Sequence, residues 1–232
     1  MKQMGYDRAI VTFSPEGRMY QVEYARKAVE SLSTTAVGIV FAGGVVLAAF
    51  KEIPKLLVGE SIEKISKVDE HIGIAACGIL ADYRVLIEHA RIRCQINRIT
   101  FEEPIELNAL VKDLADRKQR FTQIGGLRPY GVGFLIAGND SRPHLYETDP
   151  SGTIREWMAH SIGRGSKNSR KLLIEEYKEG LPKDKAIQLS LKALEAAEKK
   201  LMPRHVELGI VEGGAFTILD RDAVREWLKK FA

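Results

Sequence analysis

The sequence predicts an α+β protein built from antiparallel sheets that helices cover. Two observations carry this prediction: the apolar, β-branched runs come in groups, and each of two groups is followed by two consecutive helical patterns. A parallel sheet would instead need a crossover, usually a helix, between successive strands. Two sheets, each covered by a helix pair, would stack as four layers, although the order of elements alone does not fix that stacking.

The first element is a tight turn that leads into an amphipathic helix. Ser14-Pro15-Glu16-Gly17 favours a chain reversal, because proline presets φ at the second turn position and glycine tolerates a strained one. Beyond it, apolar residues recur at helical spacing up to residue 30, namely Met19, Val22, Ala25 and Val29. This stripe has no obvious partner within the chain.

The first group of strands follows the helix. We expect strands over 35–41 and 45–50, joined by a hairpin turn at Ala42-Gly43-Gly44, and a third over 72–78. Helical spacing then predicts helices over 79–96 and 106–121.

The second group repeats this order. Strands are expected over 132–138, 144–149 and 154–162, followed by helices over 166–179 and 183–200. The chain closes with strands over 206–211 and 216–219 and a helix over 222–231, for which Asp222 is the expected N-cap.

Composition indicates one compact unit, a single domain over 1–232. The chain is 45% hydrophobic and has no Pro/Ser/Gly-rich linker. Its 35 basic and 31 acidic residues are interleaved, with a net charge of +4, which indicates a solvated surface and argues against nucleic-acid binding.

No composition signal points to a membrane, a metal or a cofactor. The longest apolar run, 72–81, is far shorter than the roughly 20 residues of a membrane span. The five histidines lack metal-ligand spacing, and Cys77 and Cys94 form no paired framework. We therefore expect no metal and no cofactor, and a reducing, cytoplasmic compartment.

The first turn and helix also resemble the N-terminal signature of proteasome α subunits. The matching runs are Tyr6-Asp7-Arg8, Phe13-Ser14-Pro15-Glu16-Gly17-Arg18 and Gln21-Val22-Glu23-Tyr24-Ala25. The resemblance implies the four-layer α-β-β-α sandwich of the N-terminal-nucleophile hydrolases over 34–232, preceded by a gating tail, turn and helix over 1–30.

The same resemblance implies a non-catalytic component of an outer heptameric ring. Such a homo-oligomeric α ring would gate the passage of unfolded protein substrates, bind the C-termini of a regulatory ATPase or other activator, and template assembly of the β ring. Catalysis would lie in the partner β subunits, and the process would be intracellular protein degradation.

Three groups of site residues follow from the resemblance. The gate residues would be Tyr6, Asp7, Arg8, Pro15 and Tyr24. The activator pocket would contain Lys64, whose ammonium suits a terminal carboxylate, with Gly17 across the same pocket. The loop around the axial channel would contain Ile124, Gly125, Gly126, Leu127 and Arg128, with Ile124 where relatives often have tyrosine.

The main alternative is a self-activating threonine peptidase with Thr34 as its nucleophile, because Thr34-Thr35-Ala36-Val37-Gly38-Ile39 looks like the start of a proteolytic β chain of the proteasome. In that mechanism the free α-amino group of the terminal threonine is the base. Here Thr34 follows Ser33, and the position of the catalytic acid, sixteen residues on, holds Phe50; only Lys64 matches a catalytic residue. A stand-alone binding module is the third possibility.

Overall fold

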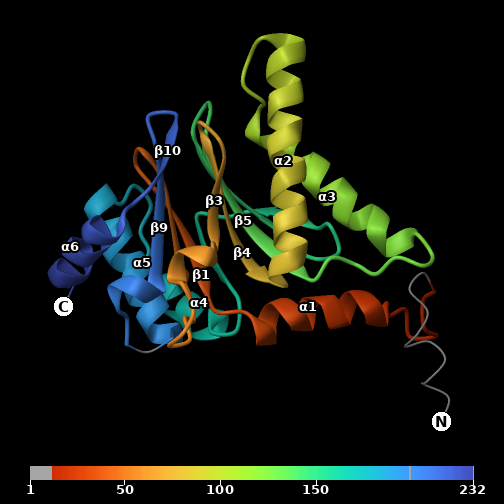
Figure 1. The fold of residues 1–232 in the computed structure, drawn as a ribbon, viewed down its shortest axis with the longest axis horizontal. Coiled ribbons are helices and arrows are strands. Elements are labelled where there is room, and N and C mark those ends of the chain that lie inside the picture. Colours follow the sequence, from red (N-terminus) through yellow and green to blue (C-terminus); the bar gives the residue numbers. More distant parts are fainter. Residues whose placement is uncertain (1–11, 199, 232) are drawn as a thin grey trace.

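The computed structural model describes residues 12–198 and 200–231. Two five-stranded antiparallel sheets lie face to face (Figure 1), with strand orders β10-β9-β2-β1-β8 and β3-β4-β5-β6-β7. The first sheet contains β1 (Ala36–Phe41), β2 (Gly44–Phe50), β8 (Ala159–Ile162), β9 (Val206–Glu212) and β10 (Ala215–Ile218). The second contains β3 (Ile65–Asp69), β4 (Ile72–Gly78), β5 (Val132–Asn139), β6 (Pro143–Thr148) and β7 (Ile154–Glu156).

Helices cover the outer side of each sheet. The helices are α1 (Tyr20–Leu32), α2 (Leu80–Phe101), α3 (Leu107–Gln123), α4 (Ser166–Glu176), α5 (Lys183–Glu198) and α6 (Arg221–Phe231), with short 3-10 turns η2 (Gly59–Ser61) and η3 (Pro203–His205). Helices α2 and α3 pack on the second sheet, whereas α4, α5 and α6 pack on the first. The predicted four-layer α-β-β-α sandwich is therefore confirmed.

Three apolar layers hold the sandwich together. Leu86, Leu110 and Phe134 belong to the layer between α2/α3 and the second sheet. Leu47, Leu135 and Phe216 belong to the layer between the two sheets. Ile39, Leu191 and Leu208 belong to the layer between the first sheet and α4–α6.

The predicted hairpin between the first two strands is confirmed. Phe41 pairs with Gly44 at its end, and a Cβ on Gly44 would lie 1.8 Å from the carbonyl oxygen of Val211 in the neighbouring strand. Only glycine fits there, because β9 approaches the turn so closely.

The prediction of a single strand over 154–162 is wrong. The segment forms two short strands, because it crosses from one sheet to the other. Its first part, β7, pairs with β6, and its second part, β8, pairs with β1. Between them the amide of Trp157 donates to Leu145 O and the carbonyl of Met158 accepts from Val40 N, so consecutive residues serve different sheets. An apolar run has no feature that marks such a change of partner.

Two smaller expectations also change. Strand β3 is not among the strands that the sequence predicts, and Asp222 is not the N-cap of the last helix. That helix begins at Arg221, and Asp220 Oδ1 accepts a hydrogen bond from Ala223 N at 2.8 Å, which is the N-cap contact.

The apolar stripe of α1 does have a partner in its own chain. Val22, Ala25 and Val29 are buried, and Val29 belongs to the layer between the sheets. It lies against β5, where Cγ1 of Val29 would be 3.2 Å from a Cβ on Gly133. The C-terminal half of α1 is thus part of the core, while its N-terminal end extends away from the sheets (Figure 1).

Candidate functional site

Lys64 lies inside the protein and points at the residue that would be the nucleophile. It is 3% exposed. Its Nζ donates to Thr34 Oγ1 at 2.7 Å, to the Thr34 carbonyl oxygen at 2.5 Å and to Ser33 Oγ at 3.3 Å. Burial lowers the pKa of Lys64, and these three oxygens replace the water that a buried ammonium loses.

The hydroxyl of Thr34 makes a structural contact. Thr34 Oγ1 donates its proton to the carbonyl oxygen of Phe50 at 2.5 Å. Its nitrogen is a peptide amide in a chain that runs on continuously from α1 through Ser33. Because an amide has no basic lone pair, the nitrogen of Thr34 cannot activate the hydroxyl as a nucleophile.

Phe50, which stands where the catalytic acid would be, is a core residue. Its side chain is buried in the layer under α4–α6, with its ring centroid 5.4 Å from that of His205. The neighbouring acid, Glu207, is already used: Oε1 pairs with Lys51 Nζ at 2.7 Å, and Oε2 accepts the amide of Lys64 at 2.8 Å. Lys64 therefore has no acid at position 50 with which to form the pair of a threonine peptidase.

The second threonine is held equally firmly. Glu198 Oε1 accepts both the amide and the hydroxyl of Thr35 at 2.8 Å, and Glu198 Oε2 pairs with Arg164 at 2.7 Å. The hydroxyl of Thr35 in turn accepts the amide of Gly165 at 3.1 Å. This network ties the start of β1 to the start of α4.

The signature turn forms as predicted. The amide of Gly17 donates to Ser14 O at 2.8 Å, and Gly17 has a φ of +74°, which favours glycine. Pro15 on the turn and Tyr24 on α1 are both exposed. Tyr6, Asp7 and Arg8 lie outside the described residues, so the gate cluster stays a prediction.

Gly17 and Lys64 do not share a pocket within one protomer. Gly17 lines a cavity of about 710 Å³ near the start of α1, together with Met19 and Ser151. Lys64 contacts Ser33, which follows the end of α1. The 13 residues of α1 separate the two positions by about 20 Å.

The glycine loop between α3 and β5 is open at its tip and anchored at its return. Nothing lies within 4 Å of a Cβ built on Gly125 or Gly126, and Ile124 and Leu127 are exposed. Arg128 forms two hydrogen bonds of 2.6 Å with the carboxylate of Asp82.

Asp82, at the start of α2, is a residue that sequence reasoning missed. It also accepts the amide of Gly131 at 2.8 Å. Burial alone would raise the pKa of Asp82, but the hydrogen bonds from Arg128 and Gly131 outweigh it and lower the pKa. No local pattern in the sequence marks an aspartate in a first helical turn as a loop anchor.

Lys118 was also missed, because it belongs to a basic run of the kind that normally lies on the surface. It is fully buried on α3, and its Nζ donates to Val132 O, Thr148 O and Thr148 Oγ1 at 3.1, 3.1 and 2.9 Å. Burial lowers its pKa to about 7. The signal was its spacing, since Lys118 continues the apolar stripe of Leu107, Val111 and Leu114.

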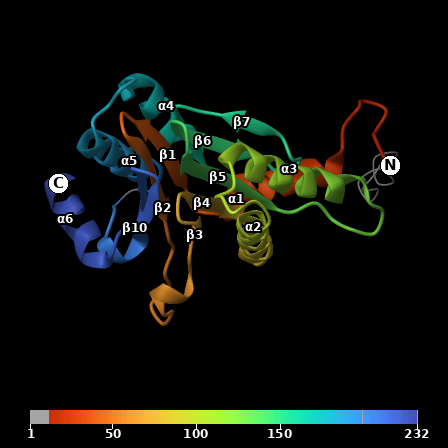
Figure 2. The same ribbon diagram turned by 90° about the horizontal axis from the view of Figure 1, so that it is seen from above.

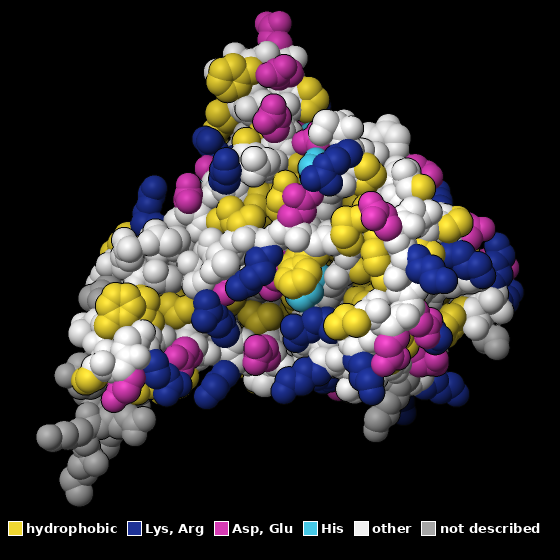
Figure 3. Space-filling view, turned by 180° about the vertical axis from the view of Figure 1, so that it is seen from behind, with side chains coloured by type: hydrophobic (Ala, Val, Ile, Leu, Met, Phe, Trp, Pro, Cys, Tyr) yellow, Lys and Arg dark blue, Asp and Glu magenta, His cyan; other side chains and the backbone are white. Residues whose placement is uncertain are grey.

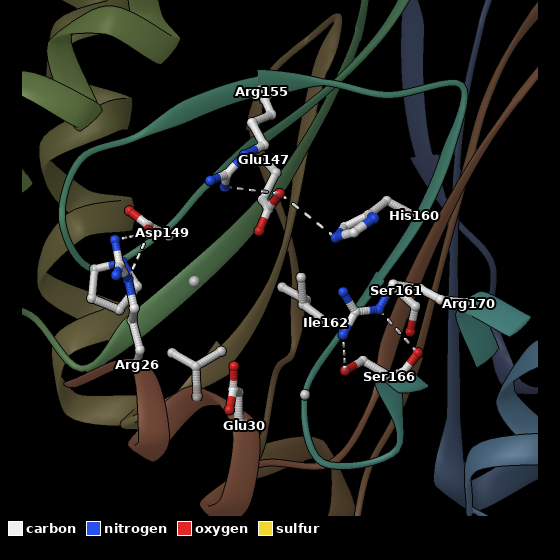
Figure 4. Close-up of a pocket in the computed structure, with 14 residues that line it drawn as sticks. Arg26, Glu30, Glu147, Asp149, Arg155, His160, Ser161, Ile162, Ser166 and Arg170 are labelled. Atoms are coloured by element: carbon white, nitrogen blue, oxygen red, sulfur yellow. Dashed lines mark hydrogen bonds and ion pairs between the residues drawn. The ribbon is translucent and has the colours of Figure 1, made fainter. Parts of the chain in front are cut away.

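A further cavity of about 320 Å³ lies between α1, the second sheet's edge and the start of α4 (Figure 4). Arg26 pairs with Asp149 at 2.9 Å on one side of it, and Arg155 lies 3.7 Å from Glu147 on another. Burial, with smaller effects of Arg170 and Arg155, lowers the pKa of His160 to about 4, so its imidazole is neutral near pH 7.

Among the described residues, two polar side chains of this cavity lack a partner: one lacks a hydrogen-bond partner and the other lacks a negative charge. Ser161 Oγ is buried with no hydrogen-bond partner among the described residues. Arg170 donates to the carbonyl and hydroxyl oxygens of Ser166, both uncharged acceptors. The cavity wall on the α4 side therefore carries excess positive charge.

Within residues 12–198 and 200–231, no group of histidine, cysteine and acidic side chains is arranged to hold a metal ion. In the same ranges, no helix has the length and apolar character that crossing a membrane requires.

Comparison with known proteins gives a consistent result over nearly the whole chain. A family model for proteasome subunits matches residues 30–211, and a second model, for the N-terminal signature of A-type proteasome subunits, matches residues 6–28. The proteasome alpha chain of Methanoregula boonei is 51% identical over 234 residues, covering 99% of this chain and 97% of the relative. The proteasome alpha chains of Archaeoglobus fulgidus and Methanopyrus kandleri are 50% and 45% identical, covering 91% and 98% of this chain and 87% and 94% of the relatives.

Proposed function

Because this chain belongs to the proteasome α-subunit family, we propose that it forms the outer ring that gates a cytoplasmic 20S core particle. Members of this family are non-catalytic ring components in protein degradation and assemble with α and β subunits in the core. Catalysis resides in the β subunits, so the alternative of a self-activating threonine peptidase does not apply.

The geometry around Thr34 is the single observation that best supports the non-catalytic role. Its hydroxyl proton is directed to Phe50 O, and Lys64 donates to its carbonyl oxygen as well as to its hydroxyl. The residues at the nucleophile position join β1, β2 and the segment before β3. They stabilise the sandwich. The Thr34 hydroxyl proton is already donated to Phe50 O, and Lys64 Nζ acts as a hydrogen-bond donor to Thr34 and Ser33.

The proposed gate lies at the N-terminal end of α1. The turn there is preorganised by its hydrogen bonds and by Pro15, and Arg18 pairs with Glu23 on the first turn of the helix. The end of α3 borders the same region, since Gln123 and Gly17 line one cavity. The signature turn and the start of the glycine loop therefore lie close enough to act on one opening.

The glycine loop is the proposed constriction for unfolded substrates. Its exposed residues are Ile124, Gly125, Gly126, Leu127 and Arg128. With Arg128 bound to Asp82, the apolar side chains Ile124 and Leu127 remain at the tip. An apolar rim makes no specific hydrogen bonds, which suits passage of chains of any sequence.

The activator pocket requires two protomers in this proposal. Because Gly17 and Lys64 lie at opposite ends of α1, the cavity at Gly17 of one protomer would face the Lys64 side of the next. An activator's terminal carboxylate would pair with the Lys64 ammonium by displacing the longest of its contacts with oxygen, Ser33 Oγ at 3.3 Å.

The tip of α2 is the proposed contact with the β ring. This helix projects past the sheets at the end of the molecule opposite α1 (Figure 1). Ile92, Ile96 and Ile99 are exposed on it, Ile99 to 81%. If the gate faces outward, this apolar tip faces the inner ring, where it would template assembly of β subunits.

The test is peptide hydrolysis by a core particle reconstituted from this chain and a β partner. Thr34→Ala should leave hydrolysis unchanged, whereas alanine in place of the β partner's terminal threonine should abolish it. Loss of hydrolysis on Thr34→Ala, with rings still formed, would contradict the proposed division of roles.

A further inference from the structure

The loop between β2 and β3 presents an apolar tip to solvent. It stands out from the body of the molecule (Figure 2). Leu56 is 97% exposed and Val58 66% exposed, with Leu57 beside them also exposed. Three consecutive apolar residues at a protruding loop tip indicate a contact surface, because such loops are usually polar.

The base of this loop is held rigidly. Lys51 Nζ donates to the carbonyl oxygens of Gly59 and Ile62, at 3.2 and 3.0 Å, and pairs with Glu207 at 2.7 Å. Lys51 thus ties both arms of the loop to β9. A tip on a fixed base loses little conformational entropy when it binds.

A groove of matching character lies between the β7–β8 crossing and α4. It encloses about 540 Å³ and is lined by Trp157, Met158, Leu173, Ile174 and Tyr177. Ile174 is 84% exposed on its rim, and Met158 is exposed beside it. His160 and Arg170 also line this groove. On the face seen in Figure 3, hydrophobic side chains lie among those of Lys and Arg.

Tip and groove lie on opposite flanks of the chain. In Figure 2 the loop before β3 points away from the side that carries α4 and β7. Complementary patches on opposite flanks make a heterologous contact, in which each protomer gives its tip to one neighbour and its groove to the other. When the rotation closes, such a contact generates a ring.

The side chains beside the two patches carry opposite charges. Arg170 at the groove donates only to neutral oxygens of Ser166 among the described residues. Glu63, exposed at the base of the loop, accepts only the hydroxyl of Ser66, at 3.3 Å, within the same ranges. Each flank thus carries a charge that the other can neutralise.

We propose that the Leu56–Val58 tip of one protomer inserts into the Trp157–Ile174 groove of the next protomer in the α ring. The inference rests on the ring of the proposed function and names the surfaces that build it. A second copy of this chain is favoured because one repeated contact covers both apolar patches, whereas any other partner would cover only one.

Disulfide trapping tests the contact directly. Leu56→Cys and Ile174→Cys chains with different tags are coexpressed and mildly oxidised; the native Cys77 and Cys94 are buried. The expected product is a disulfide between the two variants, in rings, and none when either variant is expressed alone. Ile99→Cys, at the tip of α2, replaces Ile174→Cys as the matched control and should give no disulfide with Leu56→Cys.

Charge exchange provides the second readout. Leu56→Glu and Ile174→Lys should each lower the fraction of chains in rings at least about tenfold, and the double variant should restore it, because the two new charges meet across the contact. Rings without the disulfide, or single variants that assemble normally, would overturn the proposed contact but leave the ring itself intact. Failure of the wild-type chain to form rings even with its β partner would instead overturn the proposed function.

Discussion

Arg128 and Asp82 form a bidentate ion pair in which both nitrogen–oxygen distances are 2.6 Å. The pair joins the glycine loop to the first turn of α2, and the amide of Gly131 completes the contact with Asp82. The first turn of α2 therefore fixes the return of a loop whose tip, at Gly125 and Gly126, makes few contacts. The loop's shape depends on an aspartate that lies 46 residues earlier in the chain than Arg128.

Replacing Asp82 with asparagine should loosen this loop. Asn keeps the size of the side chain but loses the charge that pairs with Arg128, at a cost of about 1–2 kcal/mol in the free energy of unfolding. Thermal unfolding should shift downward by a few degrees, and limited proteolysis should cut faster near Gly125. Asp222→Asn, in an exposed pair with Arg225, is the control and should change neither. Unaltered cleavage in Asp82→Asn would show that the loop is held by other contacts.

Replacing Lys64 with methionine should separate folding from activation. Met has a similar volume and needs no hydrogen bonds, so rings should still form. Stimulation of peptide hydrolysis by an activator should be lost, because the terminal carboxylate would have no ammonium to meet. Lys67→Met, three residues along and partly exposed, should retain stimulation. Full stimulation in Lys64→Met would remove Lys64 from the activator pocket.

The buried Lys118 should make stability depend on pH. Its pKa is about 7 in the folded chain and about 10.4 when unfolded, so unfolding between these values takes up a proton. Relative to Lys118→Met, the wild type should gain up to about 1.4 kcal/mol per pH unit as the pH rises through this window, and nothing below it. Urea unfolding at about pH 6.5, 8 and 9 measures the difference. If the difference in unfolding free energy between the wild type and Lys118→Met did not change with pH, the lowered pKa of Lys118 would be contradicted. Lys183→Met, on the surface, is the control, and its difference from the wild type should stay constant over the same pH values.

Tyr24→Ala tests the gate. Tyr24 is exposed on α1 and stacks against Tyr20, with ring centroids 6.4 Å apart. If its phenol holds the open tail, activator-stimulated peptide hydrolysis should fall in the reconstituted particle while the β subunits remain active. Tyr83→Phe, whose buried hydroxyl donates to Ser66 Oγ, is a control for loss of a phenol hydrogen bond. Normal stimulation in Tyr24→Ala would exclude that role.

The layers of this fold can be predicted from the sequence, because local rules decide them. The hairpin at Ala42-Gly43-Gly44, the turn at Ser14–Gly17 and the paired helices all depend on residues close together in the chain. The crossing at Trp157 and Met158 depends instead on which sheet edge each residue meets: β6, the preceding strand, or β1, which lies far earlier in the chain. Periodicity does not contain this information.

The functional residues also divide into positions that the sequence could identify and properties that only the structure shows. The resemblance identified Thr34 and Lys64 as the positions to compare with a nucleophile and its lysine, and the structure brings them within 2.7 Å. It could not give the burial of Lys64, because no pattern around this residue separates core from surface. The inward direction of Lys118 could have been found from its place in the apolar stripe of α3, although its basic neighbours point to the surface. The structure explains why position 50 holds phenylalanine, because an apolar side chain there packs into the core beneath α5 and α6.

Native mass spectrometry of this chain expressed alone, recording the complex and the mass of each ejected chain, tests the non-catalytic ring role most directly. We predict rings whose ejected chains are intact, at 25.9 kDa. Rings of chains that begin at Thr34 would contradict this role, because a free terminal threonine beside Lys64 would then be a working nucleophile.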